Sequence, residues 1–131
     1  MIALDTNILI RYFVKDDPAQ SKRAVQLIRR AVREGERLFL NHLVLCEMVW
    51  VLESGYDYGK EEIAGLIEKV LLTEHFETEN RDSIWKALES YRKGKADFAD
   101  YVIGQRNLNQ GCNRTVTFDR ALKDEVFFEI L

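Results

Sequence analysis

The stretch Ile2-Ala3-Leu4-Asp5-Thr6-Asn7 predicts both the class of fold and the first residue of a site. A short apolar run that ends in small polar residues is typical of a strand buried on both faces of a parallel sheet. Asp5 would lie at the carboxyl end of this strand, the edge at which open α/β sheets bind their ligands. The ordinary alternative is that Asp5 caps the helix expected from about Ile8, as Asp-Thr-Asn strings often do.

The length and composition predict one globular domain that spans residues 1–131. The chain is 47% hydrophobic and 31% charged, and one core can serve a chain of this size. No apolar run approaches the length of a membrane span, and the first residues lack the pattern of a secretion signal. Cys46 and Cys112 are far apart without CxxC spacing, which argues against a zinc site or a disulfide framework. We therefore expect a cytoplasmic protein without a membrane segment.

The charge is unevenly distributed along the chain. The net charge is -3, but residues 1–37 carry +3 and residues 38–131 carry -6. An acidic chain is not the pattern of a constitutive nucleic-acid coat, for which a strongly basic domain is expected. Local binding of nucleic acid through a small basic patch and metal ions stays compatible with this distribution.

A helix is expected from about Pro18 to Glu34, with Asp17 as its cap and Gly35 as its end. Its apolar residues share one arc, and Lys22, Arg29 and Arg33 share the opposite arc. These basic residues form either an ordinary solvated face or a surface that contacts the phosphates of a nucleic acid.

Glu47 stands alone in an apolar helix expected from about Leu43 to Ser54. Nine of the ten residues from Leu43 to Leu52 are apolar, and the tenth is Glu47. A helix that is apolar all round is expected to be buried on both sides, by the core and by a partner. An ionised Glu there needs a cation or strong donors. The alternatives are that Glu47 lies on an exposed stripe and that plain core burial explains the apolar residues.

Three further acids lie near the ends of expected elements. Asp97 and Asp100 fall in the first turn of a helix that reaches about Asn109, where residues three apart share a face. Asp119 follows a strand expected from Arg114 to Thr117, repeating the arrangement at Asp5. Asp97 by itself could be an ordinary cap.

Strands that alternate with helices predict an α/β fold with a central parallel sheet of about four to five strands flanked by helices. The other strands are expected around Leu38–Leu40, Phe76 and Val126–Phe128. Strand ends and helix starts would then form one acidic site containing Asp5, Glu47, Asp100 and Asp119, with Asp97 close by.

This acidic set predicts a metal site rather than a nucleophilic one. No Ser, Cys or His in the sequence pattern accompanies the acids as a nucleophile. Carboxylates without His or Cys ligands select hard cations, namely Mg²⁺ or Mn²⁺. Such ions activate water and neutralise charge during cleavage of a phosphodiester bond.

Four segments together resemble the PIN-domain ribonucleases, and most closely the toxin component of VapBC-type toxin–antitoxin pairs. They are Leu4-Asp5-Thr6-Asn7-Ile8-Leu9, the isolated Glu47, Asp97-Phe98-Ala99-Asp100 and Thr117-Phe118-Asp119. The resemblance implies that Asp5, Glu47, Asp100 and Asp119 bind the metal, with Asp97 as a secondary ligand. It also implies that Thr6 and Asn7 brace the first acid and that Thr117 supports the fourth. The implied activity is Mg²⁺- or Mn²⁺-dependent endonucleolytic cleavage of RNA, with an antitoxin partner and often a homodimer.

Three other functions are compatible with parts of the sequence. An aspartyl-phosphate enzyme would use Asp5 as its nucleophile, but Asn7 occupies the position where such enzymes usually carry a second Asp. A non-catalytic PIN-like binding module would be expected to have lost some of the acids. A PIN nuclease of RNA maturation, without a toxin role, would have the same fold and site.

Overall fold

The computed structural model describes all 131 residues, which divide into two compact units, Met1–Arg81 and Asp82–Leu131. Strands and helices alternate along the chain, and every strand pair is parallel. The predicted α/β class is therefore confirmed. Each unit is described on its own below.

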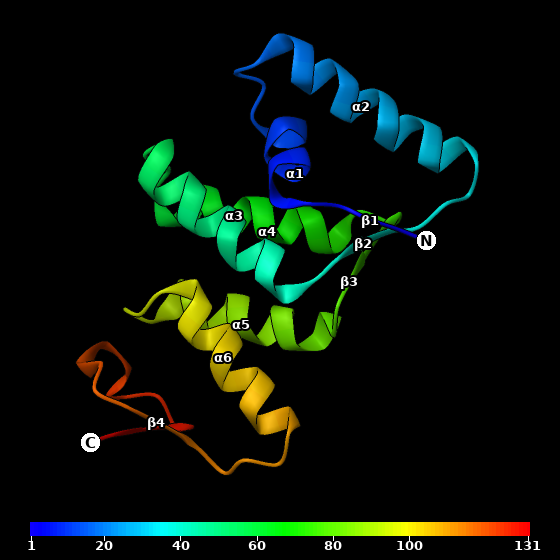
Figure 1. The fold of residues 1–131 in the computed structure, drawn as a ribbon. Coiled ribbons are helices and arrows are strands. Elements are labelled where there is room, and N and C mark those ends of the chain that lie inside the picture. Colours follow the sequence, from blue (N-terminus) through cyan, green and yellow to red (C-terminus); the bar gives the residue numbers. More distant parts are fainter. The chain divides into compact units, whose positions relative to one another are not determined.

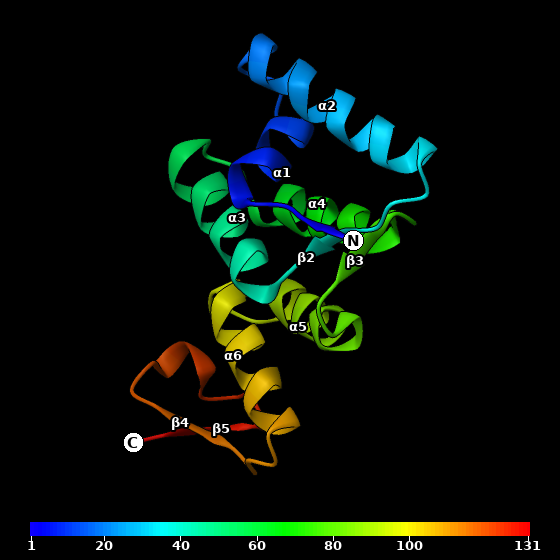
Figure 2. The same ribbon diagram turned by 45° about the vertical axis from the view of Figure 1, so that its right-hand side comes forward.

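The first unit contains a three-stranded parallel sheet in the order β1-β2-β3 (Figures 1 and 2). The strands are β1 (Ile2–Ala3), β2 (Leu38–Leu40) and β3 (Phe76–Thr78), and Leu38 lies opposite both Ile2 and Phe76. Because the strands are parallel, their carboxyl ends meet at one edge of the sheet. Asp5, Asn41 and Glu79 follow the three strands at this edge.

Four helices connect these strands: α1 (Thr6–Phe13), α2 (Pro18–Arg33), α3 (His42–Gly55) and α4 (Lys60–Leu72). The predicted start of α2 is confirmed, since the Asp17 side chain accepts a hydrogen bond from the Gln20 amide at 3.1 Å. Gly35 ends the helix with a φ of 69°, a left-handed conformation that glycine adopts without steric cost. Asn41 caps α3 by accepting from the Val44 amide at 2.9 Å. Local capping chemistry thus fixes where these helices begin and end.

The core of the first unit comes from the apolar positions of these elements. Leu38 and Leu40 of β2 are fully buried, as are Leu9 of α1, Leu45 of α3 and Ile63 of α4. Helix α1 packs against both α2 and α3. The amino-terminal helix is therefore held on two sides, which fixes the backbone next to Asp5.

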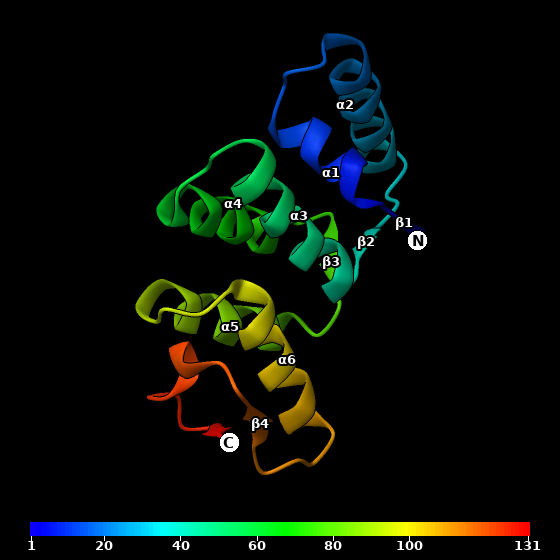
Figure 3. The same ribbon diagram turned by 60° about the vertical axis from the view of Figure 1, so that its left-hand side comes forward.

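The second unit contains most of α5 (Arg81–Lys93) and all of the elements that follow it (Figure 3). These elements are α6 (Phe98–Asn109), β4 (Thr115–Thr117), the 3₁₀ turn η1 (Arg120–Leu122) and β5 (Phe128–Ile130). Strands β4 and β5 pair in parallel as a separate two-stranded sheet. Helix α6 approaches β5 closely at Gly104, where a Cβ atom would lie 2.8 Å from the Phe128 ring. The absence of a side chain at Gly104 allows this close packing.

The structure corrects three details of the sequence prediction. The five strands form sheets of three and two rather than one central sheet, and the last strand begins at Phe128. Strand β1 is not buried on both faces, because it lies at the edge of its sheet and Ile2 is 41% exposed. Helix α3 is covered by the core on one side, where Leu45 is buried, and Leu43 and Trp50 are 79% and 67% exposed on the side where a partner is expected.

No helix combines the length and the hydrophobicity that a membrane crossing requires.

Candidate active site

Asp5 lies where the chain passes from β1 into α1. Its backbone is extended, with φ -83° and ψ 162°, and its Oδ1 accepts a hydrogen bond from the Thr6 amide at 2.7 Å. The capping role weighed from the sequence is therefore present. The side chain is exposed, and no other hydrogen bond to the carboxylate is made within the protein. One carboxylate oxygen thus stays available to a ligand at the positive end of α1.

Glu47 lines the same hollow as Asp5. This hollow has a volume of about 190 Å³, and Thr6, Asn7, Ile10, Arg11, Val51 and Tyr56 complete its wall. Glu47 is exposed on the face of α3 that also carries Leu43 and Trp50, one turn away on either side. The structure therefore places Glu47 on an exposed stripe of α3, the alternative left open by the sequence. Two carboxylates from distant parts of the chain share one hollow, which we call the carboxylate hollow.

The guanidinium group of Arg11 is paired with residues other than Asp5 and Glu47. Its guanidinium donates to Asp16 at 2.9 Å, to the Tyr56 hydroxyl at 3.0 Å and to Gln20 at 2.7 Å. The hydrogen bond with Tyr56 is the largest cause that raises the pKa of Arg11 and lowers the pKa of Asp16. Arg11 thus lines the carboxylate hollow with a guanidinium group that these hydrogen bonds hold in place.

Asp97, Asp100 and Asp119 gather in the second unit. Asp97 is the cap of α6, and its amide donates to Asp100 Oδ2 at 3.2 Å. Burial is the largest cause that raises the pKa of Asp100; the hydrogen bond from the Asp97 amide opposes it, and the negative charges of Asp97 and Asp119 add to it. The negative charges of Asp97 and Asp119 therefore act on Asp100, whose ionised form is disfavoured.

Asp119 is held by two short-range contacts after β4. Its amide donates to the Thr117 hydroxyl at 3.0 Å, and its Oδ1 accepts from the Ala121 amide at 2.9 Å. Thr117 therefore fixes the backbone of Asp119. Thr6 is buried at the start of α1, whereas Asn7 is exposed and lines the carboxylate hollow.

The acids fit a hard divalent cation by their chemistry. Within neither unit do three acid, His or Cys side chains lie in an arrangement ready to hold an ion. However, burial is the largest cause of the raised pKa of Asp100, and the negative charges of Asp97 and Asp119 raise it further by repulsion. A cation with a preference for oxygen ligands would relieve that repulsion.

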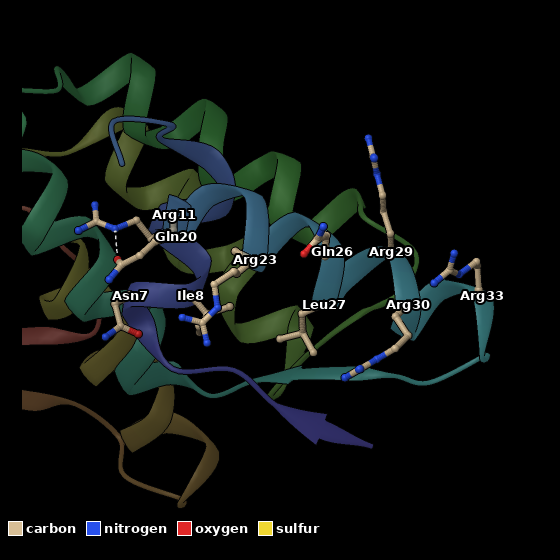
Figure 4. Close-up of a pocket in the computed structure, with 11 residues that line it drawn as sticks. Asn7, Ile8, Arg11, Gln20, Arg23, Gln26, Leu27, Arg29, Arg30 and Arg33 are labelled. Atoms are coloured by element: carbon tan, nitrogen blue, oxygen red, sulfur yellow. Dashed lines mark hydrogen bonds between the residues drawn. The ribbon is translucent and has the colours of Figure 1, made fainter. Parts of the chain in front are cut away.

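The basic candidates lie along α2, where the structure also brings forward residues that the sequence interpretation missed. A groove of about 840 Å³ is lined by Arg29 and Arg33, and also by Arg11, Arg23 and Arg30 (Figure 4). Lys22 does not line this groove and faces a neighbouring hollow with Arg29. Residues seven apart in a helix share a face, so the spacing of Arg23 and Arg30 was a usable signal.

Comparison with known proteins agrees with this description. The family model described as the PIN domain matches residues 2–125. A VapC ribonuclease of Aquifex aeolicus (strain VF5) is 29% identical over 123 residues, which cover 94% of this chain and 90% of that protein. The matched range extends through both units. The resemblance stated from the sequence motifs is confirmed, and the chain belongs to the PIN-domain family.

Proposed function

We propose that this protein is a metal-dependent endoribonuclease that hydrolyses phosphodiester bonds of cytoplasmic RNA, as the toxin of a toxin–antitoxin pair. The observation that carries the proposal is the carboxylate hollow, where Asp5 and Glu47 face the same space in a chain of the PIN family. The similarity to a VapC ribonuclease supports both the RNA substrate and the toxin role.

The proposed metal ligands are Asp5 and Glu47 in the first unit and Asp97, Asp100 and Asp119 in the second. Bound Mg²⁺ or Mn²⁺ would supply an activated water and stabilise negative charge on the phosphate. The remaining tasks belong to the chain: Thr6 and the start of α1 hold Asp5, and Thr117 holds Asp119. No Ser, Cys, His or Lys side chain lines the carboxylate hollow, Thr6 is buried, and the Tyr56 hydroxyl donates to Asp16. The wall of the hollow therefore supports hydrolysis by water better than attack by a side-chain hydroxyl or thiol.

The exposed face of α3 supports the proposal of a protein partner. Leu43 and Trp50 together expose a large apolar area on both sides of Glu47. Exposed apolar patches of this kind mark interaction surfaces, and an apolar helix face is a common site for a partner helix. We propose that an antitoxin or a second copy of the chain in a homodimer covers this face. A nuclease of RNA maturation remains the second candidate, since the same site would serve it.

The first experiment measures cleavage of total RNA by the purified protein, free of antitoxin, in Mg²⁺ or Mn²⁺ and in EDTA. Asp5→Asn and Asp100→Asn should each lower the cleavage rate by at least about 100-fold, since even changes beyond the direct ligands of a metal cost 10- to 100-fold. Asp57→Asn and Asp124→Asn are matched controls, because they remove an exposed carboxylate from each unit outside the proposed ligand set.

Two results would reject the nuclease. One is intact RNA with the wild-type protein together with no heat of metal binding in calorimetry. The other is cleavage that continues unchanged in both Asp5→Asn and Asp100→Asn, since this would point to a contaminating nuclease. Either result would favour the non-catalytic binding module.

A further inference from the structure

The groove along α2 concentrates arginine side chains. Five of its eleven lining residues are arginines, and the others are Asn, Gln, Ile, Ala and Leu, without a single carboxylate. The whole chain carries a net charge of -3, so this concentration of positive charge is local. We call it the arginine groove.

The helical period places part of these charges in one row. Arg23, Gln26, Arg30 and Arg33 follow one another at intervals of three or four residues, which lie on the same face of a helix. Figure 4 shows Arg23 and Arg30 directed to the same side of α2, whereas Arg29 points away from them. Arg23 and Arg30 are seven residues apart, which corresponds to about 10 Å along the helix axis.

The protein does not compensate this row. No carboxylate lies within ion-pair distance of Arg23, Arg29, Arg30 or Arg33, whereas Arg11 and Arg37 each form an ion pair. Neighbouring guanidinium groups repel one another, and a bound polyanion would relieve that repulsion. Planar guanidinium groups with several donors match phosphate oxygens particularly well.

The arginine groove leads to the carboxylate hollow. Asn7 and Arg11 line both, so the two spaces share a wall along α1. A polyanion held by Arg23 and Arg30 therefore extends toward Asp5 and Glu47. Since a nucleic-acid strand advances about 3.4 Å per nucleotide, the distance between Arg23 and Arg30 corresponds to more than one phosphate.

We propose that the arginine groove binds the sugar–phosphate backbone of the RNA strand next to the scissile bond, with Arg23 and Arg30 as the principal phosphate contacts. This inference rests on the proposed function and specifies how the substrate is held. No aromatic side chain lines the groove, so it offers no surface for base stacking. The contacts therefore position the strand without reading its sequence, and any base preference arises elsewhere.

The test compares RNA affinity as a function of salt, measured by fluorescence anisotropy with a labelled oligouridylate and a labelled oligonucleotide of mixed sequence. Binding is measured in EDTA with proteins that carry Asp100→Asn, so that the RNA stays intact. Arg23→Ala with Arg30→Ala is compared with Lys69→Ala with Lys86→Ala, which removes the same charge from exposed positions of α4 and α5. Alanine favours the helix, and circular dichroism checks the fold. Lys22→Ala tests the neighbouring hollow of α2, because Lys22 lines that hollow and not the arginine groove.

Loss of two phosphate contacts should lower the slope of log affinity against log salt by about 1.4, at about 0.7 per contact for a single strand. Between 50 and 200 mM salt the variant should then lose about sevenfold less affinity than the control, equally for both oligonucleotides. The control pair and Lys22→Ala should keep the parent slope.

Three outcomes would overturn the inference. An unchanged slope in Arg23→Ala with Arg30→Ala would remove the groove from RNA binding, even if the wild-type protein still cleaves RNA in the metal assay. A change in slope with only one of the two oligonucleotides would indicate that the groove contacts bases as well as phosphates. Unchanged RNA binding with weakened neutralisation by the antitoxin would assign the groove to a protein partner. Failure of the nuclease itself is seen separately, in the cleavage assay.

Discussion

At the scale of single residues, ionisation of Asp100 should lower the stability of the metal-free protein. Burial raises its pKa above the ordinary value of 3.8, so the folded state disfavours the ionised carboxylate. The contribution of Asp100 to the free energy of unfolding is fully present below its ordinary pKa. It is lost as the pH rises through the raised pKa of the folded state. Asp100→Asn should therefore raise the melting temperature at neutral pH in EDTA, by at most a few degrees, and should bring no gain in acid.

The measurement is thermal unfolding of wild-type protein and Asp100→Asn over a series of pH values. Asn can still accept the hydrogen bond from the Asp97 amide, so the cap of α6 is preserved. Asp124→Asn serves as the control because it changes an exposed carboxylate in the same unit. A melting temperature that falls in Asp100→Asn at neutral pH would contradict the cost of ionising this half-buried carboxylate.

At the scale of elements, one cluster connects the end of α1, the following loop and the end of α3. The Tyr56 hydroxyl donates to Asp16 at 2.9 Å and accepts from Arg11 at 3.0 Å. Because the hydrogen bond from Tyr56 is the main cause of the lowered pKa of Asp16, Tyr56→Phe should move that pKa up toward 3.8. Carbon-detected NMR titration of the carboxyl group measures the shift.

Tyr58→Phe is the matched control for this experiment. Tyr58 contacts the Tyr56 ring edge-on, with 6.3 Å between ring centroids, and its hydroxyl makes no hydrogen bond within the protein. The pKa of Asp16 should therefore stay low in Tyr58→Phe. Equal pKa values of Asp16 in the wild-type protein and Tyr56→Phe would show that Arg11 alone holds the cluster together.

At the scale of the whole molecule, binding of the proposed metal should stabilise the folded protein against thermal unfolding. A ligand that binds only the folded state at 100 times its dissociation constant stabilises that state by about 2.7 kcal/mol. Saturating Mn²⁺ should therefore raise the melting temperature of the wild-type protein by several degrees. The increase should be smaller in both Asp5→Asn and Asp100→Asn, and unchanged in Asp57→Asn and Asp124→Asn. Equal increases in all five proteins would place Mn²⁺ away from the proposed ligands.

Much of the fold was predictable because its signals are local. Asp17 and Pro18 start α2, Gly35 follows its end, and Asn41 starts α3, each through contacts within a few residues. The positions of Asp5 and Asp119 directly after strands follow from the same local patterns. The exposure of Leu43 and Trp50 was not predictable, because apolar composition does not say which face of a helix the core covers.

The sequence by itself determined the order of strands and helices, the helix caps, the acidic residues and the family, because these depend on neighbours along the chain. Only the tertiary structure decided that Glu47 shares a hollow with Asp5, that burial raises the pKa of Asp100, and that Arg23 and Arg30 line a groove. Each of these depends on which distant surfaces pack together. Packing between distant segments sets burial, local charge density and the walls of cavities, and short-range periodicity does not contain that information.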